Sequence, residues 1–193
     1  MQELDKIREV IRQLSHIPVL EWEEFAAGLR VKKFHKGDFI IREGEIENHI
    51  YFLNTGATRH YFISDGKEFT VDFLFEGSFV TAYYSFITRE RSTIFIEILE
   101  ESETVVISRE WLYAFYNKYH HTERIGRLIA ESQYVKRLRR EMDLLSLTAE
   151  QRYLALMEKN PALVNSISIK HLSSFLGIQP ESLSRIRKQY SKN

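Results

Sequence analysis

The pattern of apolar and polar residues divides the chain into a helical start, a β-rich middle and a helical C-terminal part. Apolar residues recur every three or four positions over residues 3–14, which predicts an amphipathic helix. Pro18 ends this pattern, and residues 21–29 predict a second short helix. The chain is therefore expected to open with two helices before its first strand.

Short runs of β-branched and aromatic residues, separated by turn residues, occupy residues 30–108. Asp65-Gly66 is the strongest turn signal, because a tight hairpin needs positive φ where glycine is least strained. Many short strands without helices between them predict an antiparallel roll or sandwich. The predicted strands lie in residues 31–34, 38–43, 49–54, 57–64, 67–75, 92–100 and 103–108.

Helical spacing returns after Ser108, a suitable N-cap for a helix over residues 111–119. The next helical pattern starts at Thr122 and keeps one narrow apolar stripe for about 24 residues, or about 36 Å of helix. A helix lying on the roll is one interpretation, but this length and the charged flanks favour a parallel partner helix, and hence a homodimer. The stripe consists of Ile125, Leu128, Ile129, Ser132, Val135, Leu138, Met142 and Leu145.

Residues 148–151, Thr-Ala-Glu-Gln, match a capping box in which Thr148 and Gln151 each bond to the other's backbone N–H. A helix that restarts here marks a domain boundary, and Asn160-Pro161 is expected to end it. The predicted architecture is α+β, with three parts. These are a β-roll domain with the N-terminal helices over residues 1–121, a dimerisation helix over 122–147 and a C-terminal domain over 148–193.

Composition narrows the classes of protein. The 193 residues are 44% hydrophobic and include no cysteine, which excludes disulfides, thiolate catalysis, zinc fingers and Cys-ligated clusters. No apolar run approaches the roughly 20 residues of a membrane span, and no signal-peptide core opens the chain. We expect a cytoplasmic protein without a membrane partner.

Charge is unevenly distributed, although the net charge is zero. Residues 148–193 hold seven lysines and arginines against three acidic residues, a net charge of +4. The same difference can arise by chance on a protein surface. It nevertheless favours an anionic partner at the C-terminal end.

Residues 169–188 fit a helix-turn-helix pattern. Ser173 is the small residue needed where the two helices cross, Gly177 supplies positive φ in the turn, and Pro180 opens the second helix. A plain helical hairpin is the alternative, but the local basic charge and the upstream dimer helix favour binding to double-stranded DNA. The expected DNA contacts are Lys170, Glu181, Ser182, Arg185, Lys188 and Gln189.

A β-roll enzyme of the cupin type is the main alternative class. Such a site needs a His-x-His pair with further ligands, and none of the seven histidines forms one. His120-His121 is expected between helices, where adjacent side chains diverge. No catalytic triad or carboxylate pair is recognisable, so we expect neither an enzyme nor a metal or other cofactor. A cyclic-nucleotide-binding module without DNA binding would lack the motif around Gly177.

The order of parts resembles the cyclic-AMP receptor protein and fumarate–nitrate reduction regulator family. The resemblance covers nearly the whole chain, with local matches at Glu43-Gly44-Glu45, at Glu90-Arg91-Ser92 and at residues 177–185. It implies a cyclic-nucleotide-binding-like jelly roll, a homodimer and a near-palindromic operator. It also implies a small effector bound by the roll, and RNA polymerase as a further partner.

The roll departs from the cyclic-nucleotide-binding members of that family. Phe79-Val80-Thr81 stands where those members have Phe-Gly-Glu, so the ribose-binding carboxylate is missing and Val80 crowds the backbone. Arg91 and Ser92 match the phosphate-binding pair; Arg91 either binds another anion or only forms an ion pair on the roll. We expect weak or no binding of cyclic AMP. The effector-binding residues implied by the resemblance are Val80, Thr81, Ala82, Arg91 and Ser92.

The recognition helix departs from the family too. Pro180 replaces a base-contacting arginine, whereas Glu181 and Arg185 match the other two contact positions. The operator should therefore differ from the family's best-known one. The sequence ends at Asn193, so no β-hairpin wing is expected, and backbone contacts would come from helix ends and residues 163–169.

Overall fold

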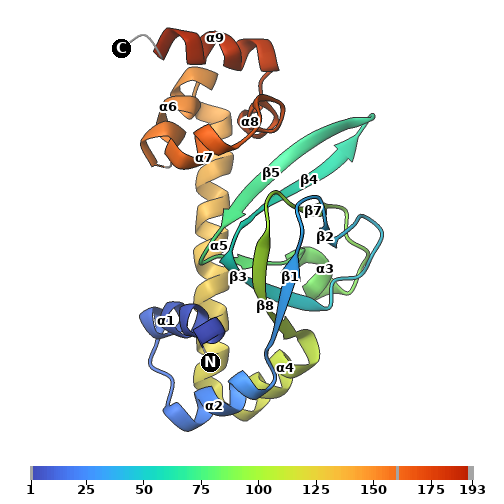
Figure 1. Ribbon diagram of the computed structural model, residues 1–193, viewed down its shortest axis with the longest axis vertical. Coiled ribbons are helices and arrows are strands. Elements are labelled where there is room, and N and C mark those ends of the chain that lie inside the picture. The colour runs from blue at the N-terminus through green and yellow to red at the C-terminus, as the bar shows by residue number, and fades with distance from the viewer. Residues whose placement is uncertain (1, 160, 191–193) are drawn as a thin grey trace. The chain divides into compact units, whose positions relative to one another are not determined.

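The computed structural model describes residues 2–159 and 161–190, and its strands form two four-stranded antiparallel sheets (Figure 1). The first sheet has the order β1-β8-β3-β6 and the second has the order β2-β7-β4-β5. The strands are β1 (Arg30–Phe34), β2 (Phe39–Ile41), β3 (His49–Thr55), β4 (Ala57–Ser64), β5 (Lys67–Phe75), β6 (Phe79–Val80), β7 (Phe95–Ile98) and β8 (Ser102–Ser108). The predicted antiparallel roll is confirmed.

One apolar cluster joins the two sheets. Leu53 of β3 and Val80 of β6 belong to the first sheet, and Ile96 and Ile98 of β7 belong to the second; all four are fully buried. Strand alternation explains this, because every second residue of each strand points to the same face. The β4–β5 hairpin turns at Asp65 and Gly66, whose φ angles of 50° and 73° confirm the turn predicted there.

Helices form a second core at one end of the roll. This core contains Ile7 of α1 (Asp5–Leu14), Phe25 of α2 (Val19–Ala27) and Phe115 of α4 (Arg109–Lys118). Ser108 caps α4 as predicted, since its hydroxyl oxygen accepts a hydrogen bond from the Trp111 N–H at 3.2 Å.

Two predictions about the end of the roll were wrong. A short helix, α3 (Tyr83–Thr88), lies between β6 and β7, where no helix was expected. The second error concerns α5 (His120–Ser146), which begins at His120 rather than Thr122, so the two histidines start the helix instead of lying between helices. Tyr119 has extended backbone angles and separates α4 from α5 by itself.

The long helix is confirmed, but its apolar stripe is divided. Ile125 is 5% exposed and packs in the helical core, with Ile129 partly buried beside it, so the first part of the stripe is covered by its own chain. The later members Val135, Leu138 and Met142 are 46%, 44% and 59% exposed. Only this second part is available to a partner helix.

Four further helices come after α5 in the described part of the sequence. Thr148 and Gln151 form the predicted capping box, with N···O distances of 2.8 and 3.2 Å. Asn160 lies outside the described residues, and α6 ends at Lys159 as expected. The helix over residues 161–166 was not expected. The helices are α6 (Ala149–Lys159), α7 (Pro161–Ser166), α8 (Ile169–Leu176) and α9 (Pro180–Tyr190).

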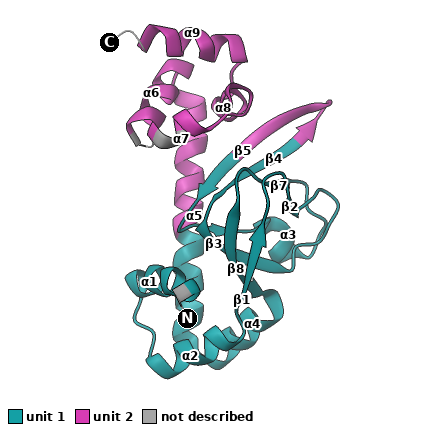
Figure 2. Cartoon of the chain, viewed as in Figure 1, with its two compact units in different colours: residues 1–62, 72–131 teal, residues 63–71, 132–193 magenta. Residues whose placement is uncertain are grey.

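The chain forms two compact units, coloured separately in Figure 2. The first contains residues 1–62 and 72–131, and the second contains residues 63–71 and 132–193. The second unit thus includes the tip of the β4–β5 hairpin together with α6 to α9. None of the described helices is long and apolar enough to cross a membrane.

Candidate nucleic-acid interface and effector site

A tight turn joins α8 to α9 and depends on Gly177. Its φ of 68° and ψ of 35° are left-handed, and the Ile178 N–H donates to the Ser173 carbonyl oxygen at 3.0 Å. A Cβ atom at residue 177 would lie 3.7 Å from the nearest atom, a Leu144 carbon. Glycine is therefore required for its backbone angles and not for lack of space.

Small and apolar side chains fix the packing of α8 against α9. Leu172 and Leu176 of α8 and Leu183 of α9 are at most 2% exposed, and Ser173 is 1% exposed. The Ser168 hydroxyl caps α8 by accepting the His171 N–H at 3.2 Å. These are the inward positions that the motif predicts, and the opposite face of α9 is left outside the core.

Two of the basic residues counted in the C-terminal charge have structural roles. Arg152 of α6 donates from Nε and Nη2 to the Leu176 carbonyl oxygen, at 3.1 and 2.9 Å. Arg187 of α9 donates to the Val164 carbonyl oxygen at 2.6 Å. Both guanidinium groups satisfy carbonyls at or near helix ends, so fewer basic side chains can contact a partner directly than the sequence indicates.

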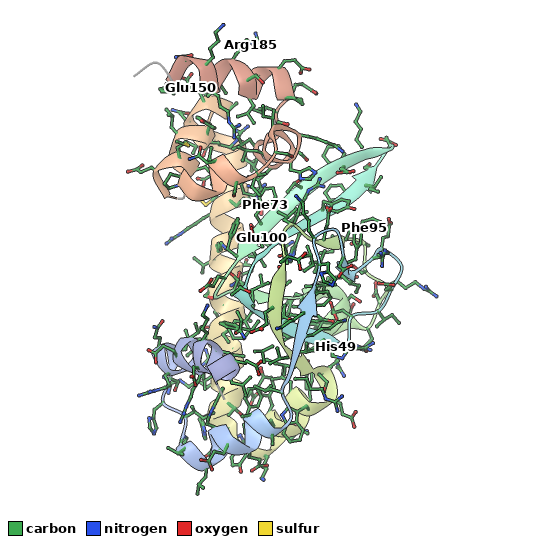
Figure 3. All side chains as sticks on the ribbon, viewed as in Figure 1. His49, Phe73, Phe95, Glu100, Glu150 and Arg185 are labelled. Carbon is green, nitrogen blue, oxygen red and sulfur yellow. The ribbon has the colours of Figure 1, made fainter. Side chains whose placement is uncertain are left out.

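The predicted DNA contacts on α9 lie on its outer face. Glu181, Arg185, Lys188 and Gln189 are exposed and Ser182 is half-buried. Arg185 points away from the other helices of its unit (Figure 3), and its Nη2 lies 3.4 Å from the Ser182 hydroxyl. Gln189 also donates from Nε2 to a Glu150 carboxylate oxygen of α6 at 3.3 Å, so Glu181, Ser182, Arg185 and Lys188 are the predicted contacts that could reach a shared surface.

Lys170 is bound by the hairpin tip of its own unit. Its Nζ lies 3.3 Å from a Glu68 carboxylate oxygen, and the Ser174 hydroxyl donates to the Glu68 carbonyl oxygen at 3.0 Å. The Thr70 N–H donates to the same hydroxyl at 2.8 Å. Sequence reasoning missed this contact, because it joins segments more than a hundred residues apart that share no local pattern.

The predicted effector residues of the roll fall into two groups. Val80 and Ala82 are at most 2% exposed and belong to the apolar cluster between the sheets. The Thr81 hydroxyl donates to the His49 carbonyl oxygen at 2.9 Å, so this side chain is tied to the neighbouring strand.

Arg91 and Ser92 bind the loop before β3. Arg91 donates from Nη1 to the Gly44 carbonyl oxygen at 2.8 Å, and the Ser92 N–H donates to the Glu45 carbonyl oxygen at 2.7 Å. The Ser92 hydroxyl is buried and donates to the Ile94 carbonyl oxygen at 2.8 Å. Both predicted anion-binding residues thus hold the loop of residues 42–48 in place.

Sequence reasoning missed Glu47, which lies in this loop. Its side chain is nearly fully buried, and burial raises its pKa to about 7. The backbone N–H groups of His49, Ala82 and Asn48 act in the opposite direction, because they stabilise the ionised form. Since a glutamate amid other charged loop residues usually faces solvent, the sequence offered no signal for its burial.

The described residues contain no group of three histidine, aspartate or glutamate side chains placed to hold a metal ion.

Figure 3 labels His49 on β3, one of the histidines of the roll. Burial lowers its pKa first, and the positive charge of Lys32 lowers it further. The side chain therefore favours its neutral form.

Comparison with known proteins agrees with the architecture. Residues 31–119 match the family model described as the cyclic nucleotide-binding domain. No curated protein sequence matches the chain. The match ends at the C-terminus of α4, so it covers the roll and leaves α5 to α9 outside.

Solved structures extend the likeness beyond the roll. The c-di-GMP responsive global regulator CLP of Xanthomonas campestris is 20% identical, with a TM-score of 0.69 over 91% of this chain and 92% of that one. FixK2 of Bradyrhizobium japonicum is 20% identical, with a TM-score of 0.72 over 85% of each chain. The catabolite activator protein of Thermus thermophilus is 19% identical, with a TM-score of 0.55 over 91% of this chain and 84% of that one. Residues 31–119 thus form a roll of the cyclic nucleotide-binding type, within a chain that shares the fold of these proteins.

Proposed function

We propose that the chain is a DNA-binding transcription regulator that acts as a homodimer on a near-palindromic operator. The observation that carries this proposal is the α8–α9 pair. Its inner faces are closed around Ser173 and Leu183, and its outer face presents Arg185 and its polar neighbours on one helix. A helix of this kind fits the major groove, where side chains read base edges.

The exposed part of the α5 stripe supports the dimer. Val135, Leu138, Met142 and Leu145 are spaced by three or four residues, and Leu145 is 84% exposed. A single exposed apolar residue is common on protein surfaces. A row of four along one helix face favours packing against the same helix of a second copy. A two-fold axis along α5 would present two α9 helices to half-sites about 34 Å apart.

The roll is proposed to sense a small effector other than cyclic AMP. Its predicted effector segment keeps Val80 in the core and uses Arg91 to hold Gly44. The buried Val80 opposes a cyclic phosphate in that segment, whereas the Arg91 bond to Gly44 uses only one of the five N–H donors of its guanidinium. Cyclic AMP binding to the purified protein with a micromolar or tighter dissociation constant would contradict this part of the proposal.

Selection from random double-stranded DNA tests the central proposal. The purified full chain should enrich a two-fold symmetric sequence, because two copies of α9 would read the same bases on opposite strands. An Arg185→Ala variant should fail to enrich the same sequence. If the wild-type protein enriches no sequence at low salt, a regulatory module without DNA binding describes the chain better.

A further inference from the structure

The tip of the β4–β5 hairpin contacts one face of α8. Lys170 and Ser174 lie about one helical turn apart on α8, so they share this face. The Glu68 carbonyl oxygen accepts the Ser174 hydroxyl at 3.0 Å, and the Glu68 carboxylate lies 3.3 Å from Lys170 Nζ. Residues 63–71 and α8 belong to the same compact unit (Figure 2). One hairpin residue thus contacts α8 with both its backbone and its side chain.

Backbone hydrogen bonds hold the hairpin tip in this position. β5 is an edge strand of its sheet, and edge strands leave N–H and C=O groups available to other partners. The Thr70 N–H donates to the Ser174 hydroxyl at 2.8 Å, while that hydroxyl donates to the Glu68 carbonyl oxygen. The Glu68 carboxylate is therefore held beside Lys170 by bonds that do not depend on its charge.

Lys170 is poorly placed to stabilise α8 itself. It is the second residue of the helix, and the helix dipole disfavours a positive charge in the first turn. Its side chain is 70% exposed, so the ion pair with Glu68 adds little to the stability of the fold. The first helix of a helix-turn-helix crosses the phosphate backbone of DNA. A contact with phosphate explains a lysine at this position better than the packing of the helix does.

We propose that the Glu68 carboxylate competes with DNA phosphate for Lys170, so that the hairpin tip lowers the affinity of the chain for DNA of any sequence. The inference rests on the proposed DNA-binding function. A phosphate that approaches Lys170 must displace the carboxylate and meets its negative charge at close range. Base preference is unaffected, because a contact between lysine and phosphate carries no sequence information. Glu68 is thus a residue outside the helix-turn-helix that determines DNA affinity.

The test compares the affinity of Glu68→Gln and of the wild-type chain for random double-stranded DNA over a range of salt concentrations. Glutamine keeps the size of the side chain and removes its charge. Asp65→Asn is the matched control, because it removes the same charge from the same hairpin tip, and asparagine tolerates the positive φ of 50° there. Lys170→Ala and the double variant of Glu68→Gln with Lys170→Ala complete a double-mutant cycle. Circular dichroism and thermal unfolding establish that each variant is folded.

Glu68→Gln is expected to bind random DNA about threefold more tightly per protomer, and hence about tenfold per dimer. The slope of log affinity against log salt should steepen by about 0.9 for each phosphate contact that is gained. Asp65→Asn should gain less than about twofold, because an exposed charge without this ion pair is largely screened. Lys170→Ala and the double variant should bind alike.

Three outcomes would overturn the inference while the wild-type chain binds DNA. These are no gain for Glu68→Gln, an equal gain for Asp65→Asn, and a gain for Glu68→Gln that persists when Lys170 is replaced. If neither the wild-type chain nor any variant binds random DNA at low salt, the proposed function fails and the inference fails with it.

Discussion

Arg185 on α9 is predicted to contact DNA, and Arg91 on the roll is predicted either to bind an anion or only to form an ion pair, yet the structure holds the two in different ways. Arg91 donates to the Gly44 carbonyl oxygen of a neighbouring loop. Arg185 is exposed, and its described contact is Ser182 on its own helix, at a long 3.4 Å. The carbonyl bond fixes the position of the exposed Arg91 and uses one of its five N–H donors, whereas Arg185 has, among the described residues, only this weak contact on its own helix. This difference supports the proposal that α9, rather than Arg91, meets an anionic partner.

The largest expected effect comes from Leu138→Asp. The dimer proposal buries this 44%-exposed side chain against a second α5, and a buried aspartate would cost more than about 3 kcal/mol per dimer. Light scattering should then show a monomer at micromolar concentration, with affinity for the selected operator reduced by about a hundredfold or more.

Gln133→Asp is the matched control, because residue 133 is exposed on the same helix and lies outside the stripe. It should leave both the dimer and the DNA affinity unchanged. A wild-type chain that is already monomeric at this concentration, or a Leu138→Asp chain that stays dimeric, would show that α5 is not the dimer contact.

Glu47 should make the stability of the roll depend on pH. Its folded pKa of about 7 lies above the ordinary value of 4.5, so the folded state binds the proton more tightly than the unfolded state. The resulting stabilisation is complete below pH 4.5 and is lost as the pH rises through 7. The loss should be on the order of 3 kcal/mol between pH 5 and pH 9.

The measurement is the difference in unfolding free energy between the wild-type chain and Glu47→Gln across that range. Other groups, such as His49 with its lowered pKa, contribute to both proteins and cancel in the difference. Glu43→Gln, which removes an exposed carboxylate of the same loop, is the control for net charge. A constant difference between wild type and Glu47→Gln would mean that Glu47 does not titrate near neutral pH.

Local signals in the sequence identified much of the fold. Asp65-Gly66, Ser108, the Thr148–Gln151 box and Gly177 each fix a turn or a helix end through residues within four positions, and the structure has all of them. Such features depend on φ angles and short hydrogen bonds that a few neighbouring residues decide.

Features that depend on distant segments could not be predicted. The contact of Lys170 with Glu68 and the burial of Glu47 against Ser85 join residues far apart in the chain. Helix α3 was missed because its six residues are too few to show a helical period, and it forms where β6 meets the loop before β7. The candidate contact residues on α9 could be predicted from the sequence. The hydrogen bonds and the burial of polar residues in the roll could not, and they are known only from the structure.

Arg185→Ala and Lys188→Ala should separate base reading from charge. Loss of Arg185 is expected to cost about 1–3 kcal/mol per half-site and to relax preference at one base pair, because a guanidinium can bond guanine N7 and O6 together. Loss of Lys188 should weaken all sequences similarly and reduce the salt dependence. Competition binding with selected and random DNA distinguishes the two effects.

Arg187→Ala is the useful contrast on the same helix. This residue holds the Val164 carbonyl oxygen, so its loss should lower the unfolding free energy and leave base preference intact. If Arg185→Ala lowers affinity for random and selected DNA equally, Arg185 is not reading bases. If neither Arg185→Ala nor Lys188→Ala changes DNA binding, α9 is not the recognition helix.

The smallest expected effect is at Gly177, and it tests whether the α8–α9 turn is set by backbone angles alone. An added Cβ would have its nearest neighbour at 3.7 Å, so Gly177→Ala should cost only the strain of a left-handed residue, about 1 kcal/mol. Gly177→Asn should cost less, because asparagine adopts this conformation more readily. Denaturant unfolding should therefore rank the proteins as glycine, then asparagine, then alanine. Equal losses for the two variants would point to crowding at this turn, since both add a Cβ atom and only the backbone preference differs between them.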